Sequence, residues 1–388
     1  MIISSSSPDD AIAYLTDKTV DVRDWGESLK EYEPELHRIV NDHVDRKDKV
    51  RDDGSIEKAA RIPVGLEQLL TKRMCEFIFA IPVKRVYHNT ESDEKRQAIA
   101  KAKEAIYKHA RIDTVNSKRA LNYFASCESF TVWYVVDSPN TLYGFPCKYK
   151  LKCKTYSPMD GTELFPLFDE TGDLIAMSVR YSRKVKKENV TFFETYTAKK
   201  HYKWSQEGGS WKALKDDAFP IGKIPGVYLY RHKPIWHGLS PLREEVEYTV
   251  SRNSDVIAYN SAPILKILGE LAGGKEDKGE TRRVVRVKNG GDVDYVSWQQ
   301  AIEALKYHVD ILTKLYWSQS QMPDISFANM MSLGNIGFDA RQTLLTDAHL
   351  KVGDEAGTWI EAFERESNVI DAFLRLMNVD WADEIGNV

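Results

Sequence analysis

The sequence predicts an α+β protein in which a block of short strands lies between helical segments. Three observations support this prediction: helix patterns in residues 66–126, strand patterns separated by turns in residues 149–230, and helical spacing again from Ser240 onward. A small strand-patterned insertion interrupts the second helical part. With 388 residues and no internal repeat, the chain is long enough for two or three domains.

Helix signals follow a charged start. Residues 1–60 are rich in charge and are expected to form a short surface helix with a loosely ordered, solvated loop. Leu66–Phe79 is apolar on most faces and precedes Pro82, which predicts a buried helix. Residues 92–112 predict an exposed amphipathic helix, and residues 117–138 predict a helix that leads into an aromatic and β-branched strand.

The middle of the chain has the pattern of an antiparallel meander. The stretches DETGD (169–173) and QEGGS (206–210) supply residues that tolerate the positive φ values of hairpin turns. One strand carries a basic cluster, which is interpreted as a solvated edge that resists aggregation, with a nucleic acid contact as the alternative. The cluster consists of Arg180, Arg183, Lys184, Lys186 and Lys187.

From Ser240 onward, two long helices flank a small β unit. Ser240 and Pro241 suit the start of the first helix. The second helix follows Ser297 and Gln300, which have capping-box spacing, and ends before Pro323. Its apolar residues alternate at spacings of three and four: Ile302, Leu305, Val309, Leu312 and Tyr316.

A nearly neutral loop and a third helical run complete the pattern. The loop MPDISFANMMSLGNIGF, residues 322–338, carries one charge in a chain with 29% charged residues. Its Met, Leu, Ile and Phe side chains are costly to leave in water, so an ordinary surface loop is the less favoured interpretation. Asp339 and Gln342 repeat the capping spacing, and Gly353 and Gly357 predict a kink or break in the helix that follows.

Composition limits the classes of function. A net charge of −4 provides no global basic field, which argues against an ordinary DNA-binding protein. No apolar window is long enough for a membrane span and the start lacks a signal-peptide pattern, so the chain is expected to stay in the cytoplasm where it is made. Its four cysteines are expected to be buried free thiols, with a metal site from Cys147 and Cys153 as the weaker alternative.

An enzyme is the alternative class of function. Residues 281–288 and 292–296 predict two short strands, and Asp292 and Asp294 form a D-x-D on the second. Two carboxylates on one strand face could hold Mg²⁺ in a metal-dependent nucleotidyltransferase or nuclease. The sequence lacks H-E-x-x-H, G-x-S-x-G and P-loop patterns. The preferred interpretation therefore has no catalytic residue, no metal ligand and no cofactor.

The order of these segments resembles the portal proteins of tailed bacteriophages, of the SPP1-like, Gp6 type. The resemblance covers residues 149–377 and is strongest from Gly222 to Ser326, a range that includes GKIPGVYLYRHKPIWHGLSPL (222–242) and VVRVKNGGDVDYVSWQQAIEALKYHVDILTKLYWSQSQMPDIS (284–326). Where family members often have S-G-x-A-L-K at the entry to the long helix, this chain has NIGFDARQ, and its tail after Met377 is short.

The resemblance implies a portal fold with a mixed α/β wing, a two-helix stem, a small β-containing clip, a tunnel loop and a long kinked helix. The implied parts are the wing (residues 1–239), stem helix 1 (240–262), the clip (263–297), stem helix 2 (298–322), the tunnel loop (323–338), and the long kinked wing helix with a short crown (339–388).

The implied function is a ring-shaped channel for double-stranded DNA at the capsid vertex, built as a homo-oligomer and expected to be a dodecamer. The implied partners are the terminase large subunit, then the head-tail adaptor, and the major capsid or scaffold protein, with no membrane. DNA carries about one charge per 1.7 Å, so a neutral, polarisable loop can contact it without retaining it. The residues expected at the narrowest part of the channel are Phe327, Ala328, Asn329, Met330, Met331, Ser332 and Leu333.

The same resemblance assigns roles to the clip and stem. A basic patch in the clip is expected to bind the packaging motor or adaptor, with a simple subunit contact as the alternative; it consists of Arg282, Arg283, Arg286 and Lys288. Stem helices must pack on their own partner and on the neighbouring subunit, so their apolar residues cover more than one stripe. The charged stem residues are expected to form intersubunit ion pairs or line the channel: Arg243, Glu244, Glu247, Arg252, Asp255 and Glu303. The protein is expected in the virion and, during assembly, in the host cytoplasm.

Overall fold

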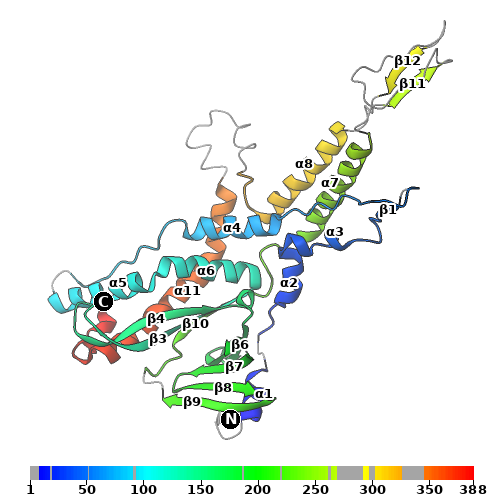
Figure 1. Ribbon diagram of the computed structural model, residues 1–388. Coiled ribbons are helices and arrows are strands. Elements are labelled where there is room, and N and C mark those ends of the chain that lie inside the picture. Colours follow the sequence, from blue (N-terminus) through cyan, green and yellow to red (C-terminus); the bar gives the residue numbers. More distant parts are fainter. Residues whose placement is uncertain are drawn as a thin grey trace. The chain divides into compact units, whose positions relative to one another are not determined.

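Two compact units make up the chain (Figure 1). The computed structural model describes residues 8–17, 20–50, 52–90, 93–185, 188–218, 221–260, 264–268, 292–296, 302–325 and 345–388. The larger unit comprises Met1–Glu33, Gly65–Gly238 and Ser318–Val388, and the smaller comprises Pro34–Val64 and Leu239–Trp317. The functional boundaries implied by the resemblance stay predictions.

The larger unit contains a group of helices that surround strands from the middle of the chain. They are α1 (Pro8–Leu15), α2 (Trp25–Tyr32), α4 (Leu66–Phe79), α5 (Glu94–Ala110), α6 (Ile112–Ser126) and α11 (Thr346–Met377), with the short 3-10 turns η2 (Pro158–Asp160), η3 (Val379–Trp381) and η4 (Ile385–Asn387). The helix predicted over Leu66–Phe79 is confirmed. Its side chains at Leu70 and Met74 are fully buried, as the apolar pattern indicated.

Two antiparallel sheets form the centre of the larger unit. One has the order β10 (Gly226–Tyr230), β3 (Glu128–Asn140), β4 (Cys147–Tyr156). The other has five strands in chain order: β5 (Glu163–Phe168), β6 (Leu174–Val185), β7 (Glu188–Thr197), β8 (Lys200–Glu207) and β9 (Ser210–Ala218). The predicted meander is therefore confirmed. In its first hairpin turn, the Asp169 carboxylate accepts hydrogen bonds from the backbone N–H groups of Thr171 and Asp173, and Gly172 has a φ of 87°.

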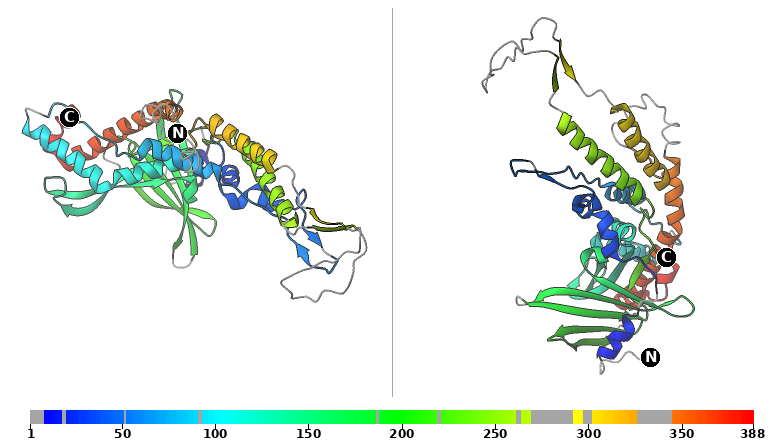
Figure 2. Two further views of the ribbon diagram at one scale, coloured as in Figure 1. Left: turned by 90° about the horizontal axis from the view of Figure 1, so that it is seen from above. Right: turned by 90° about the vertical axis from the view of Figure 1, so that its right-hand side faces the viewer.

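The sheets and helices of the larger unit form layers (Figure 2). Alternate residues of β3 serve different cores: Trp133 packs with α5 and α11, whereas Phe130 packs with the five-stranded sheet. On the other face of that sheet, Leu15 of α1 packs with Trp204 and Phe193. Because alternate residues of the strands face opposite sides, the layers of the larger unit stack in the order helices, three-stranded sheet, five-stranded sheet and helix α1.

The smaller unit contains two long helices and two short hairpin sheets. The elements are η1 (Pro34–Leu36), α3 (Arg38–Asn41), β1 (Lys49–Val50), β2 (Ile56–Glu57), α7 (Ser240–Asn260), β11 (Ile264–Leu268), β12 (Asp292–Val296) and α8 (Ile302–Ser320), whose last turn passes into the larger unit. Strand β12 pairs antiparallel with β11, so that Asp294 is opposite Lys266 in the register. The strand predicted over residues 281–288 lies outside the described residues.

Two further features, the helix around Gly353 and the basic strand β6, differ in how well they agree with the prediction. α11 runs through Gly353 and Gly357 as one helix, so of the kink or break predicted there, the break is wrong. Both glycines are exposed, and an added Cβ would meet no atom within 4 Å. The pairing of β5 with β6 ends at Arg180, so Arg183 and Lys184 have a described strand, β7, on one side only, in agreement with the predicted edge.

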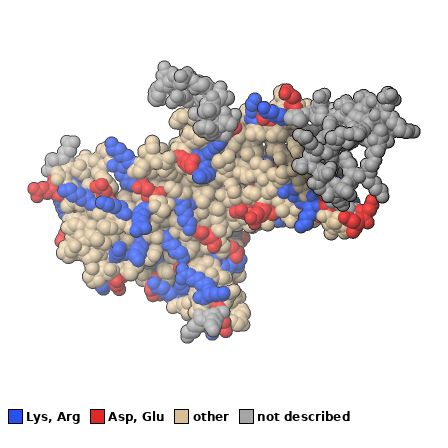
Figure 3. Space-filling view, turned by 45° about the horizontal axis from the view of Figure 1, so that its top comes forward, with Lys and Arg blue, Asp and Glu red and all other residues tan. Residues whose placement is uncertain are grey.

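The surface charges agree with the composition, and the expectation of four buried free thiols is met in part. On the face shown in Figure 3, Lys and Arg are interspersed with Asp and Glu. The cysteines are free, with Cys127 and Cys147 buried and Cys75 and Cys153 half-buried. No helix among the described residues combines the length and apolar character that a membrane crossing requires.

Candidate functional site

A polar stripe runs along one face of α7. Its members are spaced by four residues, which places them one above another on a helix. They are Arg243, Glu247, Ser251 and Asp255. The last three accept hydrogen bonds from Pro34–Val64, a segment that we call the strap. The stripe therefore holds the N-terminal strap on α7 within the smaller unit.

Glu247 is the centre of these contacts, and its side chain is fully buried. Its Oε1 accepts the backbone N–H of Val64 at 2.8 Å and lies 2.6 Å from Nδ1 of His37. Its Oε2 accepts a hydrogen bond from Nη1 of Arg243 at 2.8 Å. Because Arg243 is only 1% exposed, the ion pair is removed from water and its two charges depend on each other.

The strap is fastened again further along α7. Asp255 accepts the backbone N–H of Ala60 at 2.8 Å and pairs with the guanidinium of Arg46. The Tyr248 hydroxyl donates to Asp42. Together with backbone N–H groups of the strap, that bond lowers the pKa of Asp42 to about 2.

The other long helix, α8, has three distinct faces. One face is buried, with Leu312 9% exposed and Tyr316, four residues later, fully buried. A second apolar stripe faces solvent: Tyr307 is 69%, Ile311 38% and Leu315 42% exposed. We call these three residues the α8 apolar stripe. The third face carries exposed charged residues: Glu303, Lys306, Asp310 and Lys314.

The start of the predicted tunnel loop is held in the larger unit. After α8 ends, Nη1 of Arg73 donates to the carbonyl of Pro323 at 3.0 Å, and Nη2 lies 3.6 Å from Asp324. The ammonium of Lys351 donates to the carbonyl of Ser320, at the end of α8. Burial lowers the pKa of Lys351 to about 8, and nearby Arg231 acts in the same direction.

The residues predicted to form the tunnel loop and the basic clip patch lie outside the described residues, so Phe327 to Leu333 and Arg282 to Lys288 keep their roles as predictions. Asp292 and Asp294 both lie on β12. Within the part of the chain that the structure describes, no group of three or more His, Cys, Asp or Glu residues is placed to hold a metal ion.

The structure corrects the expectation for part of the charged stem set. Arg243 and Glu247 are buried and bonded within the chain, so they are not available as channel-lining or intersubunit charges. Asp255 is likewise engaged by the strap, whereas Arg252 and Glu303 are exposed. Sequence reasoning missed the strap. The one available signal was the spacing of four along α7, because the strap partners lie nearly 200 residues away in the chain.

Comparisons with known proteins give the family. Residues 14–385 match the family described as phage portal protein, SPP1 Gp6-like. A search of curated proteins found no match. A solved chain from the "Virion of native gene transfer agent (GTA) particle" has 10% identity and a TM-score of 0.31, over 69% of this chain and 70% of that chain. The family match spans nearly the whole sequence and is sufficient by itself: the chain belongs to the SPP1 Gp6-like family of phage portal proteins, and is a portal-type capsid protein of bacteriophage virions.

Proposed function

We propose that copies of this chain assemble into a ring, a dodecamer at the capsid vertex, through which double-stranded DNA enters and leaves. The ring docks the terminase large subunit during packaging and the head-tail adaptor afterwards, and it contacts the major capsid or scaffold protein. Assembly takes place in the host cytoplasm. The chain contributes contacts and a conduit and performs no chemistry of its own. Its membership of the portal family supports this function.

The α8 apolar stripe is the observation that carries the proposal. Three large apolar side chains at helical spacing are left in water on one copy, beside a separate face of α8 that is already packed. Covering such a stripe is favourable by roughly 25 cal/mol per Å² of apolar surface. A second copy is the proposed cover because a closed ring presents the same helix to a neighbour at every subunit contact.

The proposed parts keep the boundaries that the resemblance to portal proteins implies. The wing comprises residues 1–239, the stem helices 240–262 and 298–322, the clip 263–297, the tunnel loop 323–338, and the long helix and crown 339–388. In support of the stem assignment, α7 and α8 lie side by side within the smaller unit (Figures 1 and 2), and His308 of α8 is 3.7 Å from Glu245 of α7.

The tunnel loop is proposed to contact DNA without retaining it. Phe327 to Leu333 carry no charge, so their contacts with the DNA backbone release few counterions and resist movement little. Replacing Met330 and Met331 by lysine should slow translocation, and the slowing should diminish as salt is raised. Packaging rates that stay equal to wild type at low salt would contradict the proposed position of the loop.

The basic clip patch is proposed to bind an acidic surface of the terminase or adaptor. Reversing Arg283 and Arg286 to glutamate should leave ring assembly intact and abolish partner binding in a pull-down with purified terminase. Unchanged binding by assembled rings of this variant would remove the proposal. Loss of ring assembly instead would support the alternative, a contact between subunits.

The experiment that tests the ring is electron microscopy in negative stain with mass measurement on the same sample, repeated with capsid and scaffold proteins present. The wild-type chain should form rings with a central opening wide enough for duplex DNA. A chain that stays monomeric in both samples contradicts the proposed function.

Matched variants of α8 test whether the α8 apolar stripe is the subunit contact. Ile311→Glu places a charge in the α8 apolar stripe and should reduce the population of rings by about tenfold or more, equivalent to about 1.4 kcal/mol per contact. Lys306→Glu alters charge on the neighbouring polar face and should form rings as wild type does. Rings of the Ile311→Glu variant at wild-type abundance would show that the stripe is not the subunit contact.

A further inference from the structure

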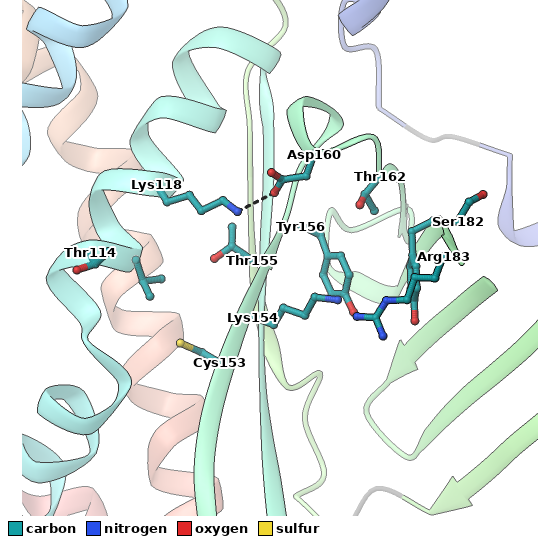
Figure 4. A pocket seen from close by; sticks show the side chains of 12 residues that line it. Thr114, Lys118, Cys153, Lys154, Thr155, Tyr156, Asp160, Thr162, Ser182 and Arg183 are labelled. Atoms are coloured by element: carbon teal, nitrogen blue, oxygen red, sulfur yellow. Dashed lines mark ion pairs between the residues drawn. The ribbon is translucent and has the colours of Figure 1, made fainter. Parts of the chain in front are cut away.

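A cavity in the larger unit has a charge pattern that the portal role does not use. Its volume is about 450 Å³, within the range of small-molecule sites. The walls come from α6, β4, η2 and β6 (Figure 4). Its polar lining includes the hydroxyl-bearing residues Thr114, Thr155, Thr162 and Ser182, beside the cations Lys118, Lys154 and Arg183. The hydroxyls of Thr155 and Ser182 each share a hydrogen bond with a neighbouring threonine, Thr131 and Thr191 respectively.

Two of these cations have no carboxylate in contact among the described residues. Lys154 places its ammonium 4.0 Å from the centre of the Tyr156 ring and 5.1 Å from that of Tyr181. The Arg183 guanidinium lies 5.4 Å from the Tyr181 ring. In Figure 4, both side chains extend toward Tyr156. Aromatic faces stabilise a cation but do not neutralise it.

The neighbouring carboxylates are occupied by other cations. Asp160 pairs with Lys118 at 2.8 Å. Glu194 accepts a hydrogen bond from Lys203 at 2.7 Å and others from the hydroxyls of Tyr181 and Tyr196. The bond to Glu194 also fixes the ring of Tyr181 in the cavity wall. The charges of Lys154 and Arg183 therefore remain as an excess of two among the described side chains around this cavity.

Burial and repulsion agree with this excess. Burial lowers the pKa of Lys154, and the positive charge of Arg183 lowers it further, followed by smaller effects of Lys203 and Lys118. Glu194 acts in the opposite direction but does not reverse the shift. An anion in the cavity would relieve this repulsion.

We propose that the cavity binds a phosphate monoester or inorganic phosphate, held by Lys154 and Arg183 with hydroxyl donors around it. Such a group carries about −1.5 to −2 charge at pH 7 and three acceptor oxygens, which matches two excess cations and a hydroxyl-lined wall. A carboxylate or a DNA phosphodiester brings one charge per group. The volume leaves space for a small organic group on the phosphate. The inference does not depend on the proposed ring.

The test is titration calorimetry of the full chain with inorganic phosphate, at constant ionic strength set with chloride. A nucleoside 5′-monophosphate and a duplex oligonucleotide without terminal phosphates serve as further probes. We expect saturable phosphate binding. Competition by the monophosphate shows that an ester enters the cavity, and binding of phosphate alone shows a site for the free anion; both support the proposal. Absence of phosphate binding, or binding of the duplex alone, overturns it.

Variants locate the binding. Lys154→Met keeps the apolar stem against Tyr156 and should weaken phosphate affinity about tenfold or more. Arg183→Met changes an exposed side chain, so it tests the site even if the first variant fails to fold. Lys184→Met is the matched control, because Lys184 is an exposed lysine next to Arg183 on β6 that is not part of the lining. Affinity that falls equally in the control, or is unchanged in Arg183→Met, contradicts the site.

Discussion

The two long helices of the smaller unit use their side chains in opposite ways. α7 presents a polar stripe in which Arg243 and Glu247 are buried, and which is bonded to the strap of the same chain through Glu247 and Asp255. α8 presents an apolar stripe that stays exposed on one copy. Loss of one partner of a buried ion pair strongly lowers the stability of the folded chain. Replacing an exposed apolar residue changes that stability little unless another surface covers the residue. The difference teaches that the polar stripe of α7 stabilises the chain, whereas the exposed stripe of α8 leaves apolar surface uncovered, which is the surface proposed above for the subunit contact.

The largest effect is expected at Glu247. Glu247→Ala takes away the carboxylate that lies 2.8 Å from the buried Arg243 and removes the acceptor for the backbone N–H of Val64, so the smaller unit should lose about 3 to 5 kcal/mol. Hydrogen exchange of the α7 backbone amides measures this loss. Arg252→Ala, at an exposed arginine of the same helix, should change stability by less than about 0.5 kcal/mol. If Glu247→Ala lost less than about 1 kcal/mol, the polar stripe would not be an important source of stability.

A matched pair of leucines sharpens the other half of the comparison. Leu312→Ala opens a cavity in the packed face of α8 and should cost about 3 kcal/mol. Leu315→Ala, at a 42% exposed position three residues later, should cost less than about 0.5 kcal/mol in the dissociated chain. Urea unfolding of both variants under dissociating conditions checks the contrast. Equal losses would mean that the α8 apolar stripe is already packed within one copy.

A smaller effect is expected from acid at the Asp42 and Tyr248 contact. The pKa of Asp42 is lowered to about 2, so its contribution is present above the ordinary value near 3.8 and is lost as pH falls toward 2. Tyr248→Phe should therefore be less stable than wild type at pH 7, and the gap should close between pH 4 and pH 2. Thermal unfolding across that range gives the measurement. A stability difference that does not change with pH would mean that the effect comes from packing of the Tyr248 side chain and not from the charge of Asp42.

The sequence predicted the local features of the fold and little of what joins distant segments. The limits of α4, the start of α7 at Ser240 and the meander follow from residue patterns that act over a few residues. The strap on α7 could not be predicted, because its charged residues have the composition of a solvated surface. Their burial arises only when Val64 and Ala60 reach Glu247 and Asp255.

The candidate site divides in the same way. A second apolar stripe on the stem helix was expected and is present in α8. The charged stem residues were interpreted as one set, although half of them are used inside the chain. A single sequence does not distinguish an arginine that is bonded to a residue of its own helix, as Arg243 is, from an arginine that faces a neighbouring subunit. The two differ in burial, which depends on the folded structure.

The smallest effect extends the comparison to α11, whose exposed face carries glycine where a break was predicted. Gly353 lies inside a continuous helix, and an added Cβ would meet no atom within 4 Å. Gly353→Ala should therefore stabilise the larger unit by about 0.5 to 1 kcal/mol, because alanine loses less backbone entropy in a helix. Thermal unfolding of this variant and of Gly357→Ala measures the gain. A loss of stability in either variant would show that the chain needs glycine there in order to bend. The exposed face of α11 would then tolerate substitution poorly, as the polar stripe of α7 does, and unlike the α8 apolar stripe.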